Sequence, residues 1–135
     1  MLKLIIGVKG TGKTKTLINM VNEAVEKSHG AVICIEKGDK LRFDVKYQAR
    51  LINTKESFVD DAQSLFGFVA GILASNHDVT DLFIDSALKI CQNDAEAFDK
   101  FLCEMEALVE KLNINVVMTS SLPVESASET VKKFL

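Results

Sequence analysis

A glycine-rich stretch near the N-terminus, placed between an apolar run and an amphipathic one, most strongly limits the folds open to this chain. The stretch reads Gly7-Val8-Lys9-Gly10-Thr11-Gly12-Lys13-Thr14. The apolar run before it, residues 2–6, is short and ends in glycine, as a buried strand does. From residue 13 to about residue 27, apolar residues recur every three or four positions, which predicts a helix. A strand, a glycine loop and a helix in this order indicate an α/β protein.

The rest of the sequence continues the alternation of strands and helices. Further strands are predicted at residues 31–35, 82–84 and 114–118, with a weaker one at 49–52, and helices at about 58–73 and 97–112. Asn53 with Glu56 has the spacing of a helix N-cap, and so has Asn93 with Glu96. Pro123 suits the first turn of a last, short helix. The pattern predicts one domain over the whole chain, a three-layer α/β/α sandwich around a mainly parallel sheet.

Composition excludes several other classes of protein. Hydrophobic residues make up 47% of the 135 residues and charged residues 26%, which excludes a disordered or low-complexity chain. The net charge of −3 gives no overall attraction to nucleic acid or to an anionic membrane, and no apolar run approaches the ~20 residues that span a bilayer. The three cysteines form no C-x-x-C pair, so we expect neither a disulfide framework nor a zinc site. We expect a cytoplasmic location.

Residues 7–14 match the pattern G-x-x-x-x-G-K-[ST] in full. Its glycines allow a loop whose backbone N–H groups point inward around a polyphosphate. The N-terminus of the following helix adds further N–H donors and a partial positive charge. From these residues the chain resembles the P-loop NTPase superfamily, in which this pattern is the Walker A motif. The resemblance implies a phosphate-binding set made of Gly7, Lys9, Gly10, Thr11, Gly12, Lys13, Thr14 and Lys15.

Within that set, the resemblance gives Lys13 and Thr14 the roles closest to the chemistry. Lys13 is expected to reach the β- and γ-phosphates, and the Thr14 hydroxyl is expected to bind the Mg²⁺ that bridges them. The superfamily's second landmark is an apolar strand that ends in an acidic residue, and Asp85 matches it as the Walker B residue that holds Mg²⁺. The alternative for Asp85 is an aspartate that caps a strand end at the surface.

The residues after Asp85 bear on the nucleotide. GTPases of the superfamily carry D-x-x-G at this point and N-K-x-D later, and this sequence has neither. We therefore expect ATP rather than GTP. The order of the motifs is similar to that of RecA-like and AAA-type ATPases, in which a polar sensor lies between Walker B and the γ-phosphate. Thr119 is the candidate sensor, with Ser120 as the alternate because a one-residue slip in register exchanges them, and both residues can also be ordinary polar strand ends.

Hydrolysis also needs a carboxylate that orients or activates the attacking water. Many relatives place a glutamate directly after the Walker B aspartate, where this chain has Ser86. The RecA-like arrangement places the acid at the end of the strand after the first helix, and Glu36 occupies that position. Glu36 is therefore the candidate base, with Asp39 as a poorer substitute. The alternative for Glu36 is a solvated strand-end glutamate paired with Lys37.

The segment 37–50 concentrates positive charge around Phe43 and Tyr47, and it contains Arg42 and Arg50, the only arginines in the sequence. These are the two candidates for an arginine that meets the charge of the transition state. Three interpretations of the segment stay open: a solvated loop, a surface for a partner or for action on a neighbouring copy, and a contact for single-stranded nucleic acid. The sequence as a whole does not indicate nucleic acid.

The sequence thus predicts an Mg-ATP-binding P-loop protein, a slow ATPase that a partner or self-assembly accelerates. The alternatives are a nucleotide-dependent switch or assembly module that does not hydrolyse ATP, and a small-molecule or nucleotide kinase. After the strand that ends near Ser121 only a short helix remains, so we expect no further strand and a sheet truncated toward the C-terminus. An exposed edge strand favours a homo-oligomer or a protein partner.

Overall fold

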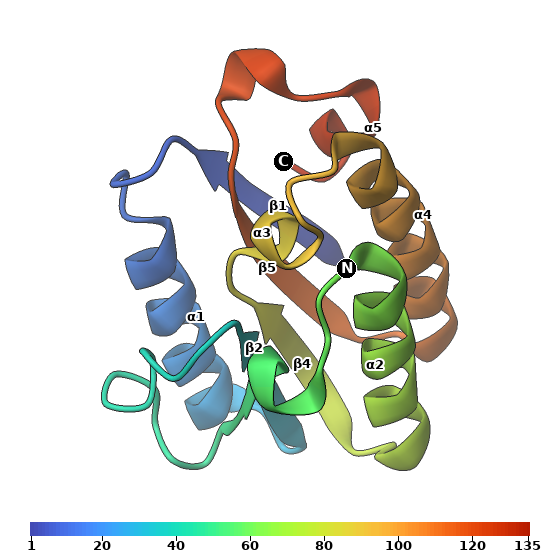
Figure 1. Ribbon diagram of the computed structural model, residues 1–135. Helices are drawn as coiled ribbons and strands as arrows, with labels where there is room; N and C mark the ends of the chain where they lie inside the picture. The colour runs from blue at the N-terminus through green and yellow to red at the C-terminus, as the bar shows by residue number, and fades with distance from the viewer.

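The computed structural model describes all 135 residues, and its strands and helices form three layers (Figure 1). The strands are β1 (Leu2–Gly7), β2 (Ala31–Glu36), β3 (Arg50–Asn53), β4 (Val79–Ile84) and β5 (Asn115–Ser121). The α-helices are α1 (Lys13–Lys27), α2 (Ala62–Ser75), α3 (Ala87–Ile90), α4 (Ala95–Leu112) and α5 (Glu129–Lys132). Two short 3-10 helices, η1 (Thr54–Ser57) and η2 (Val124–Ser126), complete the set.

The five strands form one sheet in the order β1-β5-β4-β2-β3, and every neighbouring pair is parallel. The carboxyl ends of all five strands therefore lie at one edge of the sheet. Open parallel sheets bind ligands in the crevice at this edge. Strand β5 lies between β1 and β4, so the loops that follow these three strands are neighbours although they are far apart in the sequence.

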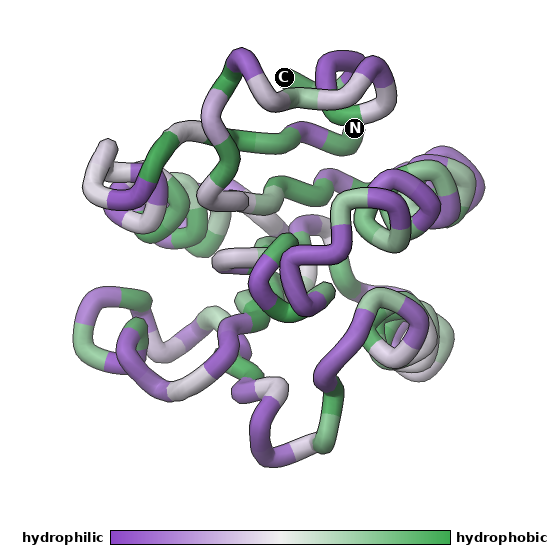
Figure 2. Tube along the Cα trace, turned by 45° about the horizontal axis from the view of Figure 1, so that its top comes forward, coloured by the Kyte–Doolittle hydropathy of each residue, from purple (hydrophilic) through white to green (hydrophobic).

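Side chains alternate between the two faces of the sheet, and each face has its own apolar layer. On one face, α1 and the segment 37–49 cover the sheet. This layer consists of Leu17, Val21, Val32, Cys34, Leu41, Val45, Ala49, Phe83 and Val117. Figure 2 shows the hydrophobic strands in the middle of the molecule, between helices that carry both polar and apolar residues. Burial of both faces explains why the strands read as continuous apolar runs.

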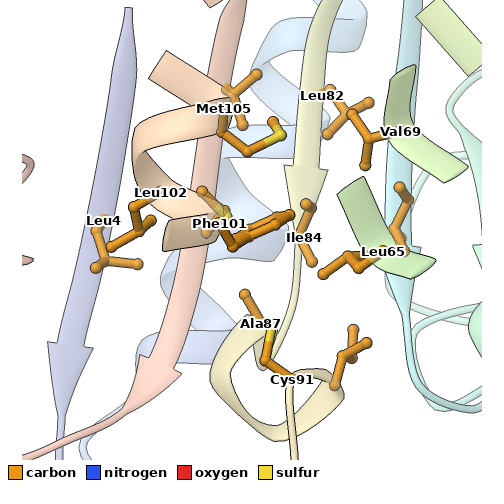
Figure 3. Close-up of a cluster of buried hydrophobic side chains, with 14 of the residues drawn as sticks. Leu4, Leu65, Val69, Leu82, Ile84, Ala87, Cys91, Phe101, Leu102 and Met105 are labelled. Carbon is orange, nitrogen blue, oxygen red and sulfur yellow. The ribbon is translucent and has the colours of Figure 1, made fainter. Parts of the chain in front are cut away.

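The helices α2 and α4 cover the other face, with α3 at its carboxyl edge. In Figure 3 the ring of Phe101 on α4 extends toward Ile84 of β4 from one side, and Leu65 and Val69 of α2 lie to the other side of Ile84 in the same apolar layer. The side chains of Leu65, Ile84 and Phe101 are at most 1% exposed. This larger layer fixes the position of β4, whose carboxyl end leads directly into Asp85.

The structure confirms the predicted fold class and most of the predicted elements. Helix α1 begins and ends at the predicted residues, and Ser28 follows it in an extended conformation. The weakly predicted strand at 49–52 forms β3 and supplies the fifth strand of the sheet. No strand follows β5, as expected. However, the C-terminal segment lies beside β1, where the backbone N–H of Leu4 donates to the carbonyl of Phe134 at 2.8 Å, so this edge is partly covered.

The predicted start of the second helix was wrong. Asn53 does act as a cap, but it caps the 3-10 helix η1, where its side chain accepts from the N–H of Lys55. Phe58 ends that turn in the left-handed region, with φ 59°, and its side chain is 88% exposed rather than part of the buried face. Helix α2 begins later, at Ala62, where Asp61 and Ser64 form a capping box.

Two other predicted helix starts also need correction. The N-cap of α4 is Asp94 rather than Asn93, and its side chain accepts from the N–H of Ala97. Pro123 does not open a continuous helix, because the chain forms η2, becomes extended at Ala127 and starts α5 only after Ser128. None of the helices has the length and apolar character needed to span a bilayer.

Candidate functional site

A polar pocket of about 510 Å³ lies at the carboxyl edge of the sheet. It is formed by the glycine loop, the first turn of α1, the carboxyl ends of β2, β4 and β5, and the segment around α3. Its lining consists of Lys9, Gly10, Gly12, Lys13, Thr14, Lys15, Glu36, Lys37, Lys40, Leu41, Asp85, Ser86, Lys89, Asn93, Thr119 and Ser121. Only one of these residues is hydrophobic. The pocket therefore suits a charged, polar ligand.

The glycine loop turns sharply between β1 and α1. Gly10 and Gly12 have φ angles of 89° and 85°, in the left-handed region that glycine enters without steric cost. The ammonium group of Lys13 bends back across the loop and donates to the carbonyl of Val8 at 2.9 Å. Helix α1 has no side-chain N-cap and no acidic residue in its first turn. Its first N–H groups are therefore left to interact with whatever the pocket holds.

Three side chains from three different elements meet beside the loop. The carboxylate of Asp85, at the end of β4, accepts from the Thr14 hydroxyl of α1 at 3.2 Å. The same oxygen accepts from the Thr119 hydroxyl of β5 at 2.8 Å. The backbone N–H of Asp85 donates to the carbonyl of Ile35 on β2 at 2.8 Å. Asp85 is thus fixed from both sides, with its carboxylate directed at the start of α1.

The alternation of side chains along β5 separates the roles of Thr119 and Ser120. Thr119 lies on the α1 face and is 1% exposed, and its hydroxyl both donates to Asp85 and accepts from the N–H of Ser86 at 2.8 Å. Ser120 is fully buried on the other face, where its hydroxyl accepts from the N–H of Leu88 at 3.2 Å. Of the two, Thr119 is the residue in the pocket.

Glu36 lies at the end of β2 and is 3% exposed. One of its carboxylate oxygens accepts from the N–H of Lys40 and the other from the N–H of Leu41, both at 3.1 Å. Burial raises the pKa of this carboxyl above its ordinary value, the two N–H donors oppose that rise, and the charge of Asp85 adds to it. Glu36 is therefore not the solvated partner of Lys37: it lines the pocket and also anchors the segment that follows β2.

The pocket is electropositive. Its lysines are Lys9, Lys13, Lys15, Lys37, Lys40 and Lys89, and its carboxylates are Glu36 and Asp85. None of these lysines belongs to any of the ion pairs in the molecule, which lie elsewhere on the surface. Unpaired cations that converge on one pocket favour a polyanionic ligand.

Behind the pocket, burial raises the pKa of the Cys34 thiol to about 12, which excludes this cysteine as a nucleophile at neutral pH.

The segment 37–49 is a folded part of the core rather than a loose loop. Leu41, Val45 and Ala49 are buried against α1 and the sheet. By contrast, the side chains of Phe43 and Tyr47 are 85% and 90% exposed.

Neither arginine lines the pocket. The guanidinium of Arg42 lies 3.6 Å from the carboxylate of Asp39 and 4.8 Å from the centre of the Phe43 ring. Arg50 is exposed on β3, the strand at the far edge of the sheet. An arginine that acts on the pocket of the same copy is therefore not in place.

The donor set fits Mg²⁺ better than a transition metal. A carboxylate and a hydroxyl, from Asp85 and Thr14, are hard oxygen ligands that lie 3.2 Å apart. No cluster of three His, Cys, Asp or Glu side chains in the molecule could enclose a metal ion. Mg²⁺ is commonly held by one or two protein oxygens together with phosphates and water, and this site offers that kind of incomplete shell.

The structure brings together nearly all of the residues that the sequence pointed to. Of the predicted phosphate-binding set, only Gly7 and Thr11 do not line the pocket. They shape the base of the loop, where the Thr11 hydroxyl donates to the carbonyl of Val8 at 2.8 Å. The sequence did not indicate several other lining residues, namely Lys37, Lys40, Leu41, Ser86, Lys89, Asn93 and Ser121. A signal for Lys89 was its position four residues after Asp85.

A scan against protein-family models and a search of curated proteins found no match to this chain.

Proposed function

We propose that this chain is a P-loop protein that binds Mg-ATP in the pocket at the carboxyl edge of the sheet and hydrolyses it slowly. A partner or a second copy then accelerates hydrolysis. The observation that carries the proposal is the meeting of Thr14, Asp85 and Thr119 beside a G-x-x-x-x-G-K-[ST] loop. Thr14 is the last residue of the loop pattern, whereas Asp85 and Thr119 lie far from it in the sequence. The convergence of these two residues on the loop supports a site for a phosphate chain with its Mg²⁺.

In the proposed complex, the loop N–H groups and Lys13 bind the phosphates. Thr14 and Asp85 would hold Mg²⁺, which supplies charge neutralisation between the β- and γ-phosphates. Thr119 holds the carboxylate of Asp85 in position. The unpaired lysines of the pocket add a positive field that favours the triphosphate.

Slow hydrolysis is expected from the hydrogen bonds that the Glu36 carboxylate already makes. Its carboxylate lies in the pocket and is the one acidic group there besides Asp85, so it is the candidate that orients the attacking water. Both of its oxygens already accept backbone N–H groups, so fewer of its lone pairs are free to accept from an attacking water. The absence of an arginine from the pocket also leaves the charge of the transition state incompletely neutralised.

A second function is favoured by the same contacts of Glu36. If the carboxylate serves only to anchor residues 40 and 41, the protein binds ATP without hydrolysing it and acts as a nucleotide-dependent switch. Binding would then be read out through the segment 37–49, which is tied to the pocket by these two hydrogen bonds.

Calorimetric titration with Mg-ATP, with Mg-GTP as competitor, tests the proposal directly, and the recovered nucleotide is assayed for ADP and phosphate. We expect binding of ATP in preference to GTP and slow release of phosphate. ATP that is bound and recovered intact would favour the switch. The matched variant is Lys13→Ala. In the wild type, the side chain of Lys13 makes one hydrogen bond, to the carbonyl of Val8 in an exposed loop. It should weaken ATP binding and leave the melting temperature of the free protein unchanged, and unaltered affinity in this variant would refute the assignment of the loop.

A further inference from the structure

We propose that Lys89, on α3, contacts the terminal phosphate of the bound nucleotide and makes the pocket prefer a nucleoside triphosphate over a diphosphate. The inference rests on the proposed function and assigns a residue that lies outside both sequence motifs. Burial and hydrogen bonds fix α3 against the sheet, and Lys89 lines the pocket.

The burial of α3 leaves its lysine one direction in which to point. Ala87, Leu88, Ile90 and Cys91 are all at most 6% exposed, and Ala87 and Cys91 are seen in the apolar layer of Figure 3. Lys89 is the one exposed residue in this run, and it lines the pocket. The helix cannot rotate without exposing its apolar neighbours, so the lysine is presented to the pocket by the packing of the core.

Hydrogen bonds and backbone conformation fix α3 further. The N–H groups of Ser86 and Leu88 donate to the hydroxyls of Thr119 and Ser120, at 2.8 and 3.2 Å. Left-handed residues stand at both ends of the segment, Ser86 with φ 58° at the start and Asn93 with φ 55° at the end. Backbone conformations of this kind cost energy in a non-glycine residue and are concentrated at functional sites. Asn93 also lines the pocket, so the whole turn is directed at it.

The position of Lys89 relative to Asp85 indicates which phosphate it meets. In the proposed complex, Lys13 binds the β- and γ-phosphates at the start of α1, and Thr14 and Asp85, whose side chains lie 3.2 Å apart, hold the Mg²⁺ that neutralises these phosphates. The terminal phosphate then lies near Asp85, and Lys89 follows Asp85 by four residues in the chain, beyond the left-handed turn at Ser86. The ammonium group of Lys89 takes part in no ion pair in the molecule, so it is available to an anion.

Lys89 also differs from the other lysines outside the glycine loop. Lys37 and Lys40 follow β2 in a segment of turns, whereas Lys89 is carried by a buried helix that is bonded to β5. Because neither arginine lines the pocket, its cations are all lysines, and Lys89 is the one on the segment that follows Asp85.

The test compares two ligands that differ in the terminal phosphate. The affinities of Mg-ADP and of Mg-AMP-PNP, a non-hydrolysable ATP analogue, are measured by calorimetry for the wild type, Lys89→Ala and Lys100→Ala. Lys100 is exposed on α4, away from the pocket, and serves as the matched control. We expect Lys89→Ala to weaken AMP-PNP binding about 10- to 100-fold, as for loss of a charge-assisted hydrogen bond, while ADP binding changes less than about twofold.

Other outcomes would contradict either the role of Lys89 or the proposed function. An equal loss for both ligands, or no loss for AMP-PNP, would overturn the role of Lys89 while leaving the nucleotide site intact. Equal affinity of the wild type for the two ligands would overturn it as well. A wild type that binds neither ligand would refute the proposed function itself. The melting temperature of Lys89→Ala is measured as well, and we expect it to equal that of the wild type, so that a loss of binding is not a folding defect.

Discussion

The Thr119 hydroxyl donates to the carboxylate of Asp85 at 2.8 Å and accepts from the N–H of Ser86 at the same distance. One buried side chain on β5 therefore fixes both the Asp85 carboxylate and the left-handed residue that follows it. The two strands are neighbours in the sheet, so the contact needs no long side chain. It links the residue proposed to hold Mg²⁺ to the start of α3, which carries Lys89.

Replacing Thr119 by valine should remove both of these hydrogen bonds while keeping the shape of the side chain. The N–H of Ser86 would be left without its acceptor in a partly buried site, so we expect a loss of about 1–3 kcal/mol in the free energy of unfolding. The freed Asp85 should also weaken Mg²⁺-dependent nucleotide binding. Urea unfolding and calorimetry measure the two effects.

Two matched variants separate these effects. Thr119→Ser keeps the hydroxyl and should retain most of the stability and binding. Ser120→Ala removes the hydroxyl that accepts from Leu88 on the other face, so it should lower stability without altering the Mg²⁺ dependence. Wild-type Mg²⁺ dependence in Thr119→Val would contradict the positioning role.

Asp85→Asn should distinguish the contribution of Mg²⁺ to binding from that of the nucleotide alone. The asparagine oxygen can still accept from Thr119, so the fold should be retained, but the negative charge that attracts Mg²⁺ is lost. We expect the gain in ATP affinity that Mg²⁺ gives to the wild type to fall about 10-fold or more, in line with loss of a charged contact. Titrations with ATP in the presence of Mg²⁺ and of EDTA measure that gain, and an equal gain in the variant would exclude Asp85 as a ligand.

The pKa of Glu36 predicts a specific pH dependence of stability. Burial raises this pKa above its ordinary value of 4.5, so the folded state binds the proton more tightly than the unfolded state. The resulting stabilisation is fully present below pH 4.5 and is lost as the pH rises through the folded-state pKa. Glu36→Gln cannot titrate, so the stability of the wild type relative to this variant should fall as the pH rises through that window.

Urea unfolding at a series of pH values from about 4 to 7 tests this difference. The control is Glu110→Gln, because Glu110 is exposed on α4 and belongs to none of the molecule's ion pairs. Parallel curves for the wild type and Glu36→Gln would mean that the carboxyl is not perturbed in the folded protein.

The parts of the fold that depend on periodicity and on the glycine loop were predictable from the sequence. Helix α1 has both boundaries as predicted because the loop fixes its start and Ser28 takes an extended conformation at its end. The start of α2 was not predictable in the same way, since two capping signals, Asn53 and Asp61, lie close together and the first serves only a 3-10 turn. The left-handed conformation of Phe58 ends the 3-10 turn, so the second signal opens the long helix.

In the candidate site, too, some residues were predictable from the sequence and others were not. The residues of the loop, Asp85 and Thr119 are marked by local patterns, and the structure brings them to one pocket. The environment of Glu36 is different, because its partners Lys40 and Leu41 are determined by the path of an irregular segment that has no periodic signal. Lys89 stands in a helix of four residues, which is too short to show a period.

Two glycine substitutions should give opposite results, because one glycine serves the loop and the other serves the sheet. At Gly12, with φ 85°, an added Cβ meets nothing within 4 Å, so Gly12→Ala should cost only the backbone strain of about 1–2 kcal/mol. Relief of that strain would turn the N–H groups of the loop, so nucleotide binding should weaken strongly.

At Gly30 an added Cβ would lie 2.2 Å from the carbonyl oxygen of Asp78 and 2.5 Å from a methyl group of Thr80. The start of β4 would have to move, and Gly30→Ala should lower the free energy of unfolding by about 1–3 kcal/mol or more. This contact is at the amino end of the strands, across the sheet from the pocket, so ATP affinity should stay at the wild-type value. Calorimetry and urea unfolding on both variants measure the contrast, and a loss of affinity in Gly30→Ala that matches the loss in Gly12→Ala would show that the glycine loop has no special role in binding.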